Sequence, residues 1–254
     1  MPIFHELDEH ILRIEISRPE KRNTLDAAML TSMTELLLKA HNDEDIRVVF
    51  IHAQPGLFCA GGDLSEQLSG PSALPTTVTG QFIEALKACS KPIVACVQGP
   101  AVGLAVTMLY YCDLVYASAK SLFSLPFTAL GLTPRYGVSL LTLLNGGYHK
   151  AAEKILLSEP ISAPEAFEMR LVSNIFEEDK TYAQAWARAQ RLAQLSPVSV
   201  QSSKRLLRQA WSTRLQEITH AESEAFHIAA QTPHAKEACA AFLEGRKPNF
   251  ENKD

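Results

Sequence analysis

Short apolar runs separated by helix-length segments constrain the fold of this chain more than any other feature. Residues 47–53, 93–97 and 114–117 are such runs, and each has the length and composition of a buried strand. A strand, a crossover and a second strand imply parallel pairing, so the pattern predicts an α/β fold. The alternating residues 10–17 predict a further strand, and Asp26 predicts the N-cap of a helix that ends near residue 41.

The character of the sequence changes near residue 178. Residues 179–244 are rich in Ala, Gln, Glu, Arg and Leu and predict a run of helices without strands. We therefore expect a β/α core over residues 1–178 and a helical region over residues 179–254. Residues 69–79, rich in Gly, Pro, Ser and Thr, are predicted to form a mobile loop.

Charge and composition exclude several classes of protein. A net charge of −4 over 254 residues argues against nucleic-acid binding, which needs a concentrated basic face. No apolar run approaches the roughly 20 residues that span a bilayer, and no secretory signal is evident. Five cysteines without C-x-x-C spacing indicate reduced thiols and neither a disulfide framework nor a zinc site. We expect a cytoplasmic enzyme without nucleic-acid or membrane partners.

Two glycine-rich segments follow predicted strands. In residues 58–64, paired glycines allow a sharp turn whose backbone N–H groups point into a cleft. Residues 97–107 again run from a strand, through glycines, into a predicted helix, whose first turn has unsatisfied N–H donors suited to a developing negative charge. Taken alone, the first segment is more typical of a tight connection between two elements.

Together with five other segments, these turns resemble the enoyl-CoA hydratase/isomerase (crotonase) family in order and spacing. The resemblance covers nearly the whole chain. Within the family, the sequence is most similar to the Δ3,Δ2-enoyl-CoA isomerase branch. Each segment is weakly specific, whereas the seven in register are strongly specific. The segments are residues 18–25, 58–64, 91–95, 99–103, 112–118, 131–134 and 242–248.

This resemblance implies a fold, an assembly and a thioester site. The fold is a ββα spiral core, and the C-terminal helices form trimers and close the CoA pocket, which gives a homotrimer or a dimer of trimers. The backbone N–H groups of Ala60 and Leu104 are expected to hold a thioester carbonyl and stabilise an enolate. No cofactor is expected, because coenzyme A is part of the substrate. By the same resemblance, the substrate-binding residues are Arg22, Thr24, Gly61, Asp63, Leu64, Gly103, Thr107, Phe127 and Lys247, with Arg246 as an alternative to Lys247 at the CoA phosphates.

The catalytic acids of the family are missing. Thr107 and Phe127 occupy the positions of the two hydratase glutamates, and Arg135 occupies that of the isomerase carboxylate. Hydration is therefore disfavoured on chemical grounds. An isomerase or related enolate enzyme would take its base from elsewhere, and the candidates are Asp63, Glu66 and Tyr136. Asp113, the only acidic residue between positions 97 and 152, is interpreted as structural.

Two other functions stay open. The Arg135 guanidinium at the reacting end would suit a carboxylate on the acyl group, as in a decarboxylase or a dicarboxylyl-CoA enzyme. Alternatively, the protein binds acyl-CoA without catalysing a reaction.

Other motifs carry little weight. Tyr116 and Lys120 have the Y-x-x-x-K spacing of short-chain dehydrogenases, but residues 1–30 contain no glycine for a dinucleotide turn. His220, His227 and His234 are seven residues apart and are interpreted as surface or interface residues.

Overall fold

A six-stranded sheet lies at the centre of the described chain, in the order β1-β2-β3-β4-β6-β9. β1 pairs with β2 in the antiparallel sense, and all the other neighbours pair in parallel. The computed structural model describes residues 2–63 and 77–251. The strands are β1 (Ile3–Asp8), β2 (Ile11–Ile16), β3 (Val48–Ala53), β4 (Ile93–Val97), β6 (Leu114–Ser118) and β9 (Asn174–Phe176).

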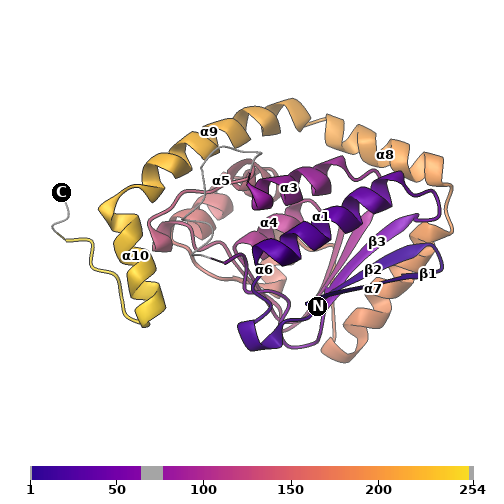
Figure 1. Cartoon of the computed structure of the whole chain (residues 1–254), viewed down its shortest axis with the longest axis horizontal. Helices are drawn as coiled ribbons and strands as arrows, with labels where there is room; N and C mark the ends of the chain where they lie inside the picture. Colours follow the sequence, from indigo (N-terminus) through magenta and orange to yellow (C-terminus); the bar gives the residue numbers. More distant parts are fainter. Residues whose placement is uncertain (1, 64–76, 252–254) are drawn as a thin grey trace.

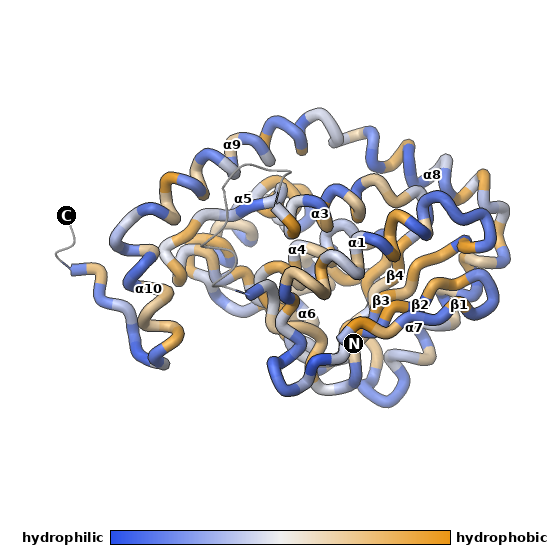
Figure 2. Tube along the Cα trace, viewed as in Figure 1, coloured by the Kyte–Doolittle hydropathy of each residue, from blue (hydrophilic) through white to orange (hydrophobic). Residues whose placement is uncertain are grey.

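Helices cover both faces of this sheet (Figure 1). Alternate strand residues such as Val49, Ile51 and Ala95 join one apolar cluster with α1 (Ala27–Asn42) and α3 (Val78–Ala88). The intervening residues, Phe50 and Val94 among them, pack with α7 (Glu178–Ala193) on the other face. Figure 2 shows the apolar strands between more polar helices. The central strands read as continuous apolar runs because both of their faces are buried.

The α/β prediction and its four strands are confirmed. β2, β3, β4 and β6 coincide with the predicted runs to within a residue. α1 begins after Asp26, whose side chain accepts a hydrogen bond from the Met29 N–H at 2.9 Å. The edge strand β1 was not predicted, because only its first residue, Ile3, is buried and no alternation marks it.

A second, three-stranded sheet in the order β5-β7-β8 lies beside the first of the two glycine turns. β5 is bridged to Cys59 and leads through Gly103 into the next helix, so this sheet connects the two turns. Its elements and their neighbours are β5 (Pro100–Val102), α4 (Leu104–Tyr110), β7 (Leu122–Ser124), the 3₁₀ turns η1 (Pro19–Lys21) and η2 (Thr128–Leu130), α5 (Val138–Leu156), β8 (Ile161–Ser162) and α6 (Ala163–Glu168).

From Glu178 to Glu244 the chain is a run of four helices. α9 runs along one side of the molecule and is followed by α10, which lies away from the sheet (Figure 1). α7 packs directly on the sheet and so belongs to the layered core, and the division into regions 1–178 and 179–254 stays a prediction. The remaining helices are α8 (Pro197–Gln209), α9 (Ser212–Ala230) and α10 (Pro233–Glu244).

The predicted mobile loop lies mostly outside the described residues. Its last part, residues 77–79, was wrongly assigned to a loop, because Thr77 is the N-cap of α3 and its side chain accepts from the Gly80 N–H at 3.0 Å.

Candidate active site

The first glycine turn is shaped by its contact with β5. Gly61 has a φ of +102°, and a Cβ there would lie 2.7 Å from the Val102 carbonyl oxygen, so only glycine fits. The buried Cys59 thiol donates to the Asn23 carbonyl at 3.0 Å, and its sulfur accepts from the Gly61 N–H at 3.3 Å. Burial raises the pKa of this thiol to about 12, so Cys59 shapes the turn and is a poor nucleophile.

The second turn is tied to the first by main-chain hydrogen bonds. The Val102 N–H donates to the Cys59 carbonyl at 3.0 Å, and the Cys59 N–H donates to the Pro100 carbonyl at 3.0 Å. Gly103, with a φ of +53°, is the N-cap of α4, so Leu104 is the first residue of that helix. The two turns therefore have a fixed relative position.

Hydrogen bonding separates the backbone donors of the first turn into two kinds. The Ala60 N–H donates to the Arg22 carbonyl at 3.1 Å and is therefore engaged within the chain. The prediction that Ala60 donates to the thioester is wrong in this structure. Gly62 differs, because its neighbours bridge to Leu25 on one side and its own N–H faces the other side.

Each of the two glycine turns has one main-chain N–H group that is available to a ligand. Among the described residues, neither the Gly62 N–H nor the Leu104 N–H has a hydrogen-bond partner. The Leu104 N–H is the first in its helix, where no carbonyl of that helix can reach it.

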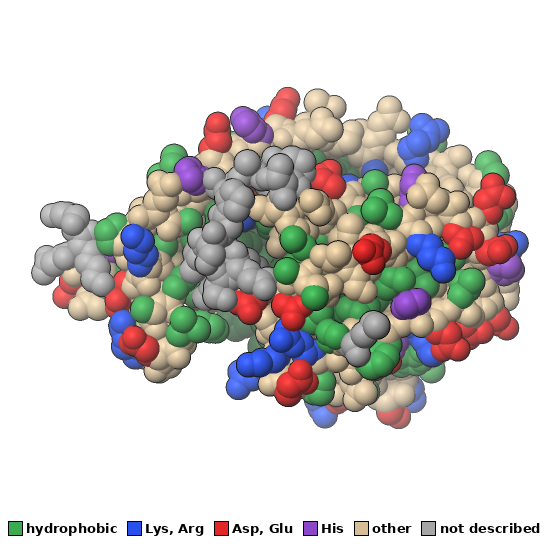
Figure 3. All heavy atoms as spheres, viewed as in Figure 1, with side chains coloured by type: hydrophobic (Ala, Val, Ile, Leu, Met, Phe, Trp, Pro, Cys, Tyr) green, Lys and Arg blue, Asp and Glu red, His purple; other side chains and the backbone are tan. Residues whose placement is uncertain are grey.

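Both residues line a cavity of about 740 Å³. One part of its wall is basic, and Figure 3 shows Lys and Arg side chains gathered beside the notch between α10 and the rest of the molecule. The opposite part is apolar and is formed by η2 and α10. The lining residues include Arg18, Lys21, Arg22, Thr24, Ala60, Gly61, Gly62, Asp63, Gly103, Leu104, Leu130, Phe242, Leu243 and Arg246.

The structure brings some of the predicted site residues together and leaves others apart. Arg22, Thr24, Gly61, Asp63 and Gly103 line the cavity, as do Ala60 and Leu104. Leu64 and Glu66 lie outside the described residues. The described lining does not include Thr107, Phe127, Arg135, Tyr136 or Lys247. Lys247 is exposed, and the neighbouring Arg246 lines the cavity instead. Arg246 forms ion pairs with Glu237 at 2.6 Å and with Glu244 at 2.5 Å.

Thr107 and Phe127, at the positions of the two hydratase glutamates, have side chains that cannot act as a general acid or base. Thr107 is 1% exposed and its hydroxyl donates to the Gly103 carbonyl at 3.2 Å, within the first turn of α4. Phe127 packs against the apolar core just before η2.

Arg135 lies between two aromatic rings. Its guanidinium carbon is 4.8 Å from the centroid of Tyr136 and 4.5 Å from that of Phe226 in α9, and the residue is 5% exposed. Burial raises the pKa of the Tyr136 phenol, while Arg135 and hydrogen bonds to Thr77 and Thr79 act in the opposite direction. The raised pKa keeps this phenol protonated near neutral pH.

Several lining residues escaped the sequence analysis. Gly62 lies in the predicted glycine turn, but its role as a donor was not predicted. The orientation of its N–H follows from the pairing with Leu25, which is far away in sequence. Lys21 and the α10 side chains Phe242 and Leu243 were not assigned either. The C-terminal motif around Arg246 was the available signal, since Phe242 and Leu243 belong to it.

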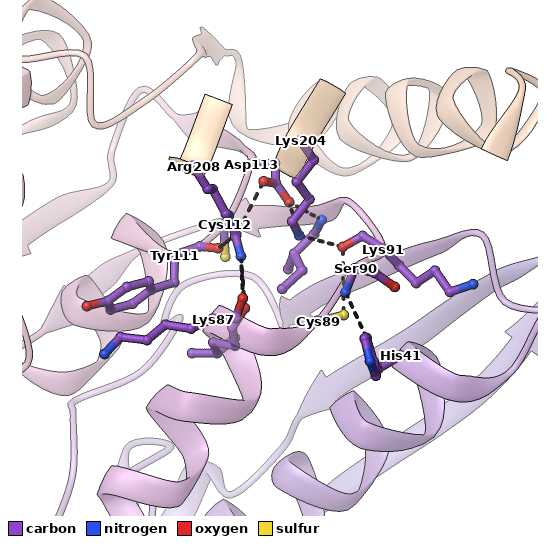
Figure 4. Close-up of polar contacts among 12 residues, drawn as sticks. His41, Lys87, Cys89, Ser90, Lys91, Tyr111, Cys112, Asp113, Lys204 and Arg208 are labelled. Carbon is purple, nitrogen blue, oxygen red and sulfur yellow. Dashed lines mark hydrogen bonds and ion pairs between the residues drawn. The ribbon is translucent and has the colours of Figure 1, made fainter. Parts of the chain in front are cut away.

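Asp113 is structural, as interpreted. Its carboxylate accepts from the Ile93 N–H and from Lys204 at 2.7 Å, and from Arg208 at 3.3 Å, so it fastens α8 to the sheet (Figure 4). The two residues of the Y-x-x-x-K motif have separate structural contacts. Lys120 forms an ion pair with Glu178 at 2.7 Å, and Tyr116 packs on Phe176.

The described residues contain no group of three or more His, Cys, Asp or Glu side chains that would hold a metal ion. All five cysteines are free thiols. Within residues 2–63 and 77–251, no helix is long and apolar enough to cross a bilayer.

Comparisons with known proteins agree with this fold. The enoyl-CoA hydratase/isomerase family model matches residues 6–253, and the chain belongs to that family. It is 32% identical over 246 residues to the 2,3-dehydroadipyl-CoA hydratase of Escherichia coli K12, covering 96% of both proteins. It is also 32% identical to enoyl-CoA delta isomerase 2 of Rattus norvegicus, over 84% of this chain and 56% of that protein.

Solved structures confirm the crotonase fold. An enoyl-CoA hydratase/isomerase from Pseudoalteromonas atlantica T6c superposes with a TM-score of 0.91 at 34% identity, over 98% of this chain and 100% of that one. Pseudomonas aeruginosa OdaA also gives 0.91 at 34% identity, over 95% and 98% of the two chains. The protein is therefore an acyl-CoA enzyme of this family, with a mixed α/β fold.

Proposed function

We propose that the protein holds an acyl-CoA thioester with its carbonyl oxygen between the N–H groups of Gly62 and Leu104. The observation that carries the proposal is that both groups lack a partner among the described residues and line one cavity. Removal of a proton next to a thioester carbonyl creates an enolate oxygen, whose charge such donors stabilise most in the transition state. One donor is worth about 2.7–4 kcal/mol where mutation has measured it.

The reaction that fits best is an isomerase-type shift of a carbon–carbon double bond. Hydration needs side chains that activate water and protonate carbon, and Thr107 and Phe127 do neither. A double-bond shift needs one group that moves a proton between two carbons. Asp63 is the candidate base, because it is the one carboxylate among the described residues that line the cavity.

Two further proton carriers are compared with Asp63 by substitution. Glu66 lies outside the described residues. Tyr136 is buried with a raised pKa, so its phenol stays protonated near neutral pH and little phenolate is present to accept a proton. Asp63→Asn should lower kcat with a 3-enoyl-CoA by about a hundredfold or more, the range of general-base catalysis, while Tyr136→Phe should lower it little. If Asp63→Asn keeps full activity and Glu66→Gln loses it, the base is Glu66.

Arg18, Lys21 and Arg22 at the basic wall are proposed to bind the CoA phosphates. No cofactor is required, since CoA enters as part of the substrate. We place the enzyme in the cytoplasm and in fatty acid metabolism.

The activity test uses three thioesters: a 3-enoyl-CoA, a 2-enoyl-CoA and a malonyl-type CoA. We expect the 3-enoyl-CoA to gain the absorbance of a conjugated thioester and the 2-enoyl-CoA to stay unhydrated. Conversion of none of them, together with micromolar binding of CoA esters, would identify a non-catalytic acyl-CoA-binding protein and refute the enzyme proposal.

A second candidate is an enzyme for acyl groups that carry a carboxylate. Arg135 supports it as a buried, permanently charged guanidinium in place of the isomerase acid, and a relative acts on 2,3-dehydroadipyl-CoA. Arg135→Ala should then weaken turnover of a carboxylated acyl-CoA far more than that of a plain one. Equal weakening of both would assign Arg135 to packing between Tyr136 and Phe226.

A further inference from the structure

A second cavity, of about 670 Å³, lies under α8 and is separate in its lining from the acyl-CoA cavity. The ends of α1 and α3 form its floor, and α8 forms its wall. Lys87, Lys204, Arg205 and Arg208 line it together with His41. No Asp or Glu belongs to its described lining, so this α8 cavity has a strongly basic wall.

The positive charge in the α8 cavity exceeds what the fold uses. Figure 4 shows Lys204 and Arg208 reaching from α8 to Asp113 and to backbone carbonyls. Lys87 is paired with Glu84 at 2.7 Å. Four Lys and Arg side chains against these two carboxylates leave an excess of two positive charges.

Arg205 takes no part in the contacts that hold α8 to the rest of the described chain. Among the described residues it forms no hydrogen bond or ion pair, whereas Arg208, one turn further along α8, donates to the carbonyls of Leu86, Lys87 and Tyr111. Gln201, Arg205 and Gln209 are spaced by four residues and share one face of α8. Arg205 therefore offers an uncommitted guanidinium fork to a ligand in the cavity.

Neutral donors complement the cations. The Ser90 N–H donates to His41 Nδ1 at 3.3 Å, which leaves the proton of a neutral His41 ring on Nε2 as a further donor. The Ser90 and Ser202 hydroxyls also line the space. Burial lowers the pKa of the Lys204 ammonium, Asp113 opposes this, and the neighbouring Arg208 lowers it further, which reflects the crowding of positive charge.

The α8 cavity continues into an aromatic one. A cavity of about 800 Å³ under α9 shares Lys87, Ala88, Arg208 and Ser212 with it and adds the side chains of Trp211 and Tyr111. A ligand that spans the two would place an anionic group on the basic wall and a planar ring near Trp211. Both volumes lie within the roughly 300–1,000 Å³ of small-molecule sites.

We propose that these joined cavities bind a nucleoside polyphosphate, with its phosphates on Arg205 and its base toward Trp211. Phosphate oxygens match the guanidinium fork and the hydroxyl and ammonium donors. The ligand is distinct from the acyl-CoA substrate, whose cavity has its own cations, Lys21 and Arg22. The inference stands independently of the reaction proposed above.

The test is titration of the full-length protein with ATP and with tripolyphosphate, in the presence of saturating CoA, followed by calorimetry and tryptophan fluorescence. We expect saturable binding of one ATP per chain, tighter than that of tripolyphosphate. Arg205→Ala should weaken it about tenfold, as loss of a charge-assisted hydrogen bond does. Arg191→Ala, an exposed arginine on α7, is the matched control and should bind normally.

Several outcomes would overturn the proposal. They are the absence of saturable ATP binding, or binding that Lys21→Ala abolishes and Arg205→Ala leaves intact. Tripolyphosphate that binds as tightly as ATP would contradict the nucleoside assignment. A smaller particle for Arg205→Glu, without ATP binding to the original chain, would show that a second copy covers this surface.

Discussion

Adjacent glycines in the first turn have different tasks. Gly61 is required for shape, since its positive φ and its closeness to the Val102 carbonyl leave no room for a Cβ. Gly62 lines the cavity, and its N–H has no partner among the residues that the structure describes. The turn could be predicted from the sequence, but the donor was wrongly predicted to be the Ala60 N–H. The hydrogen bonding of Ala60 and Gly62 depends on contacts with residues 22–25, which no local sequence pattern reveals.

Leu104 allows a test of one backbone donor with little change to the fold. It is the first residue of α4, a position where proline is tolerated, so Leu104→Pro removes the N–H and preserves the helix. We expect kcat with a thioester substrate to fall about a hundredfold, from the loss of one donor. Leu104→Ala keeps the N–H and is the control. Similar kcat values for the two variants, both with native circular dichroism, would refute the role of the N–H.

His52 should make stability depend on pH. It is buried between Phe50 and Tyr182, and its Nε2 has no partner among the described residues. Burial lowers its pKa from the ordinary 6.5, while Glu15 and the Ala53 backbone raise it less and Arg13 lowers it further.

Below pH 6.5 the unfolded chain therefore binds a proton that the folded chain rejects. Stability should fall from pH 7 to pH 5, by about 1.4 kcal/mol for each unit of pKa difference. In urea titrations, His52→Phe should lose less stability over this range than the original chain. An identical pH profile for both proteins would exclude His52 as the cause.

At the level of elements, burial decided which strands the sequence could predict. β3 and β4 are buried on both faces, so they are recognisable in the sequence as continuous apolar runs. β7 and β8 have only three and two residues, and they are strands only through pairing with segments distant in sequence, β7 with β5 and β8 with β7. The helical nature of residues after 178 followed from composition, whereas the packing of α7 on the sheet did not.

α9 holds the segment that follows η2. Its Glu222, 7% exposed, accepts from the Gly137 N–H at 2.5 Å and from the Ser139 N–H at 2.8 Å, and thereby caps α5. Glu222→Ala leaves these donors buried without a partner, so unfolding free energy should fall by about 1–3 kcal/mol. Glu222→Gln retains one acceptor and should lose less. Denaturant titration measures both, with the exposed Glu217→Ala as control. Equal stability of the Glu217 and Glu222 variants would contradict the capping role.

At the scale of the whole molecule, the described residues include large apolar side chains that remain exposed. Leu206 and Leu207 on α8 are 59% and 73% exposed, and Phe242 and Leu243 on α10 are 65% and 76% exposed. Because large exposed apolar patches mark contacts between proteins, we propose that these helices join copies of the chain into trimers. Light scattering after size exclusion should give about three or six times the chain mass of 27.9 kDa.

Charge placed on this surface should disrupt the assembly. Leu206→Glu with Leu207→Glu inserts two carboxylates where apolar side chains would meet, and desolvation of unpaired charge is costly. We expect the particle mass to drop toward that of one chain, with circular dichroism unchanged. Leu38→Glu on α1, at a position 45% exposed, is the matched control and should leave the mass unchanged. A single-chain mass for the original protein at micromolar concentration would contradict the proposal, and so would a charged variant that still forms trimers.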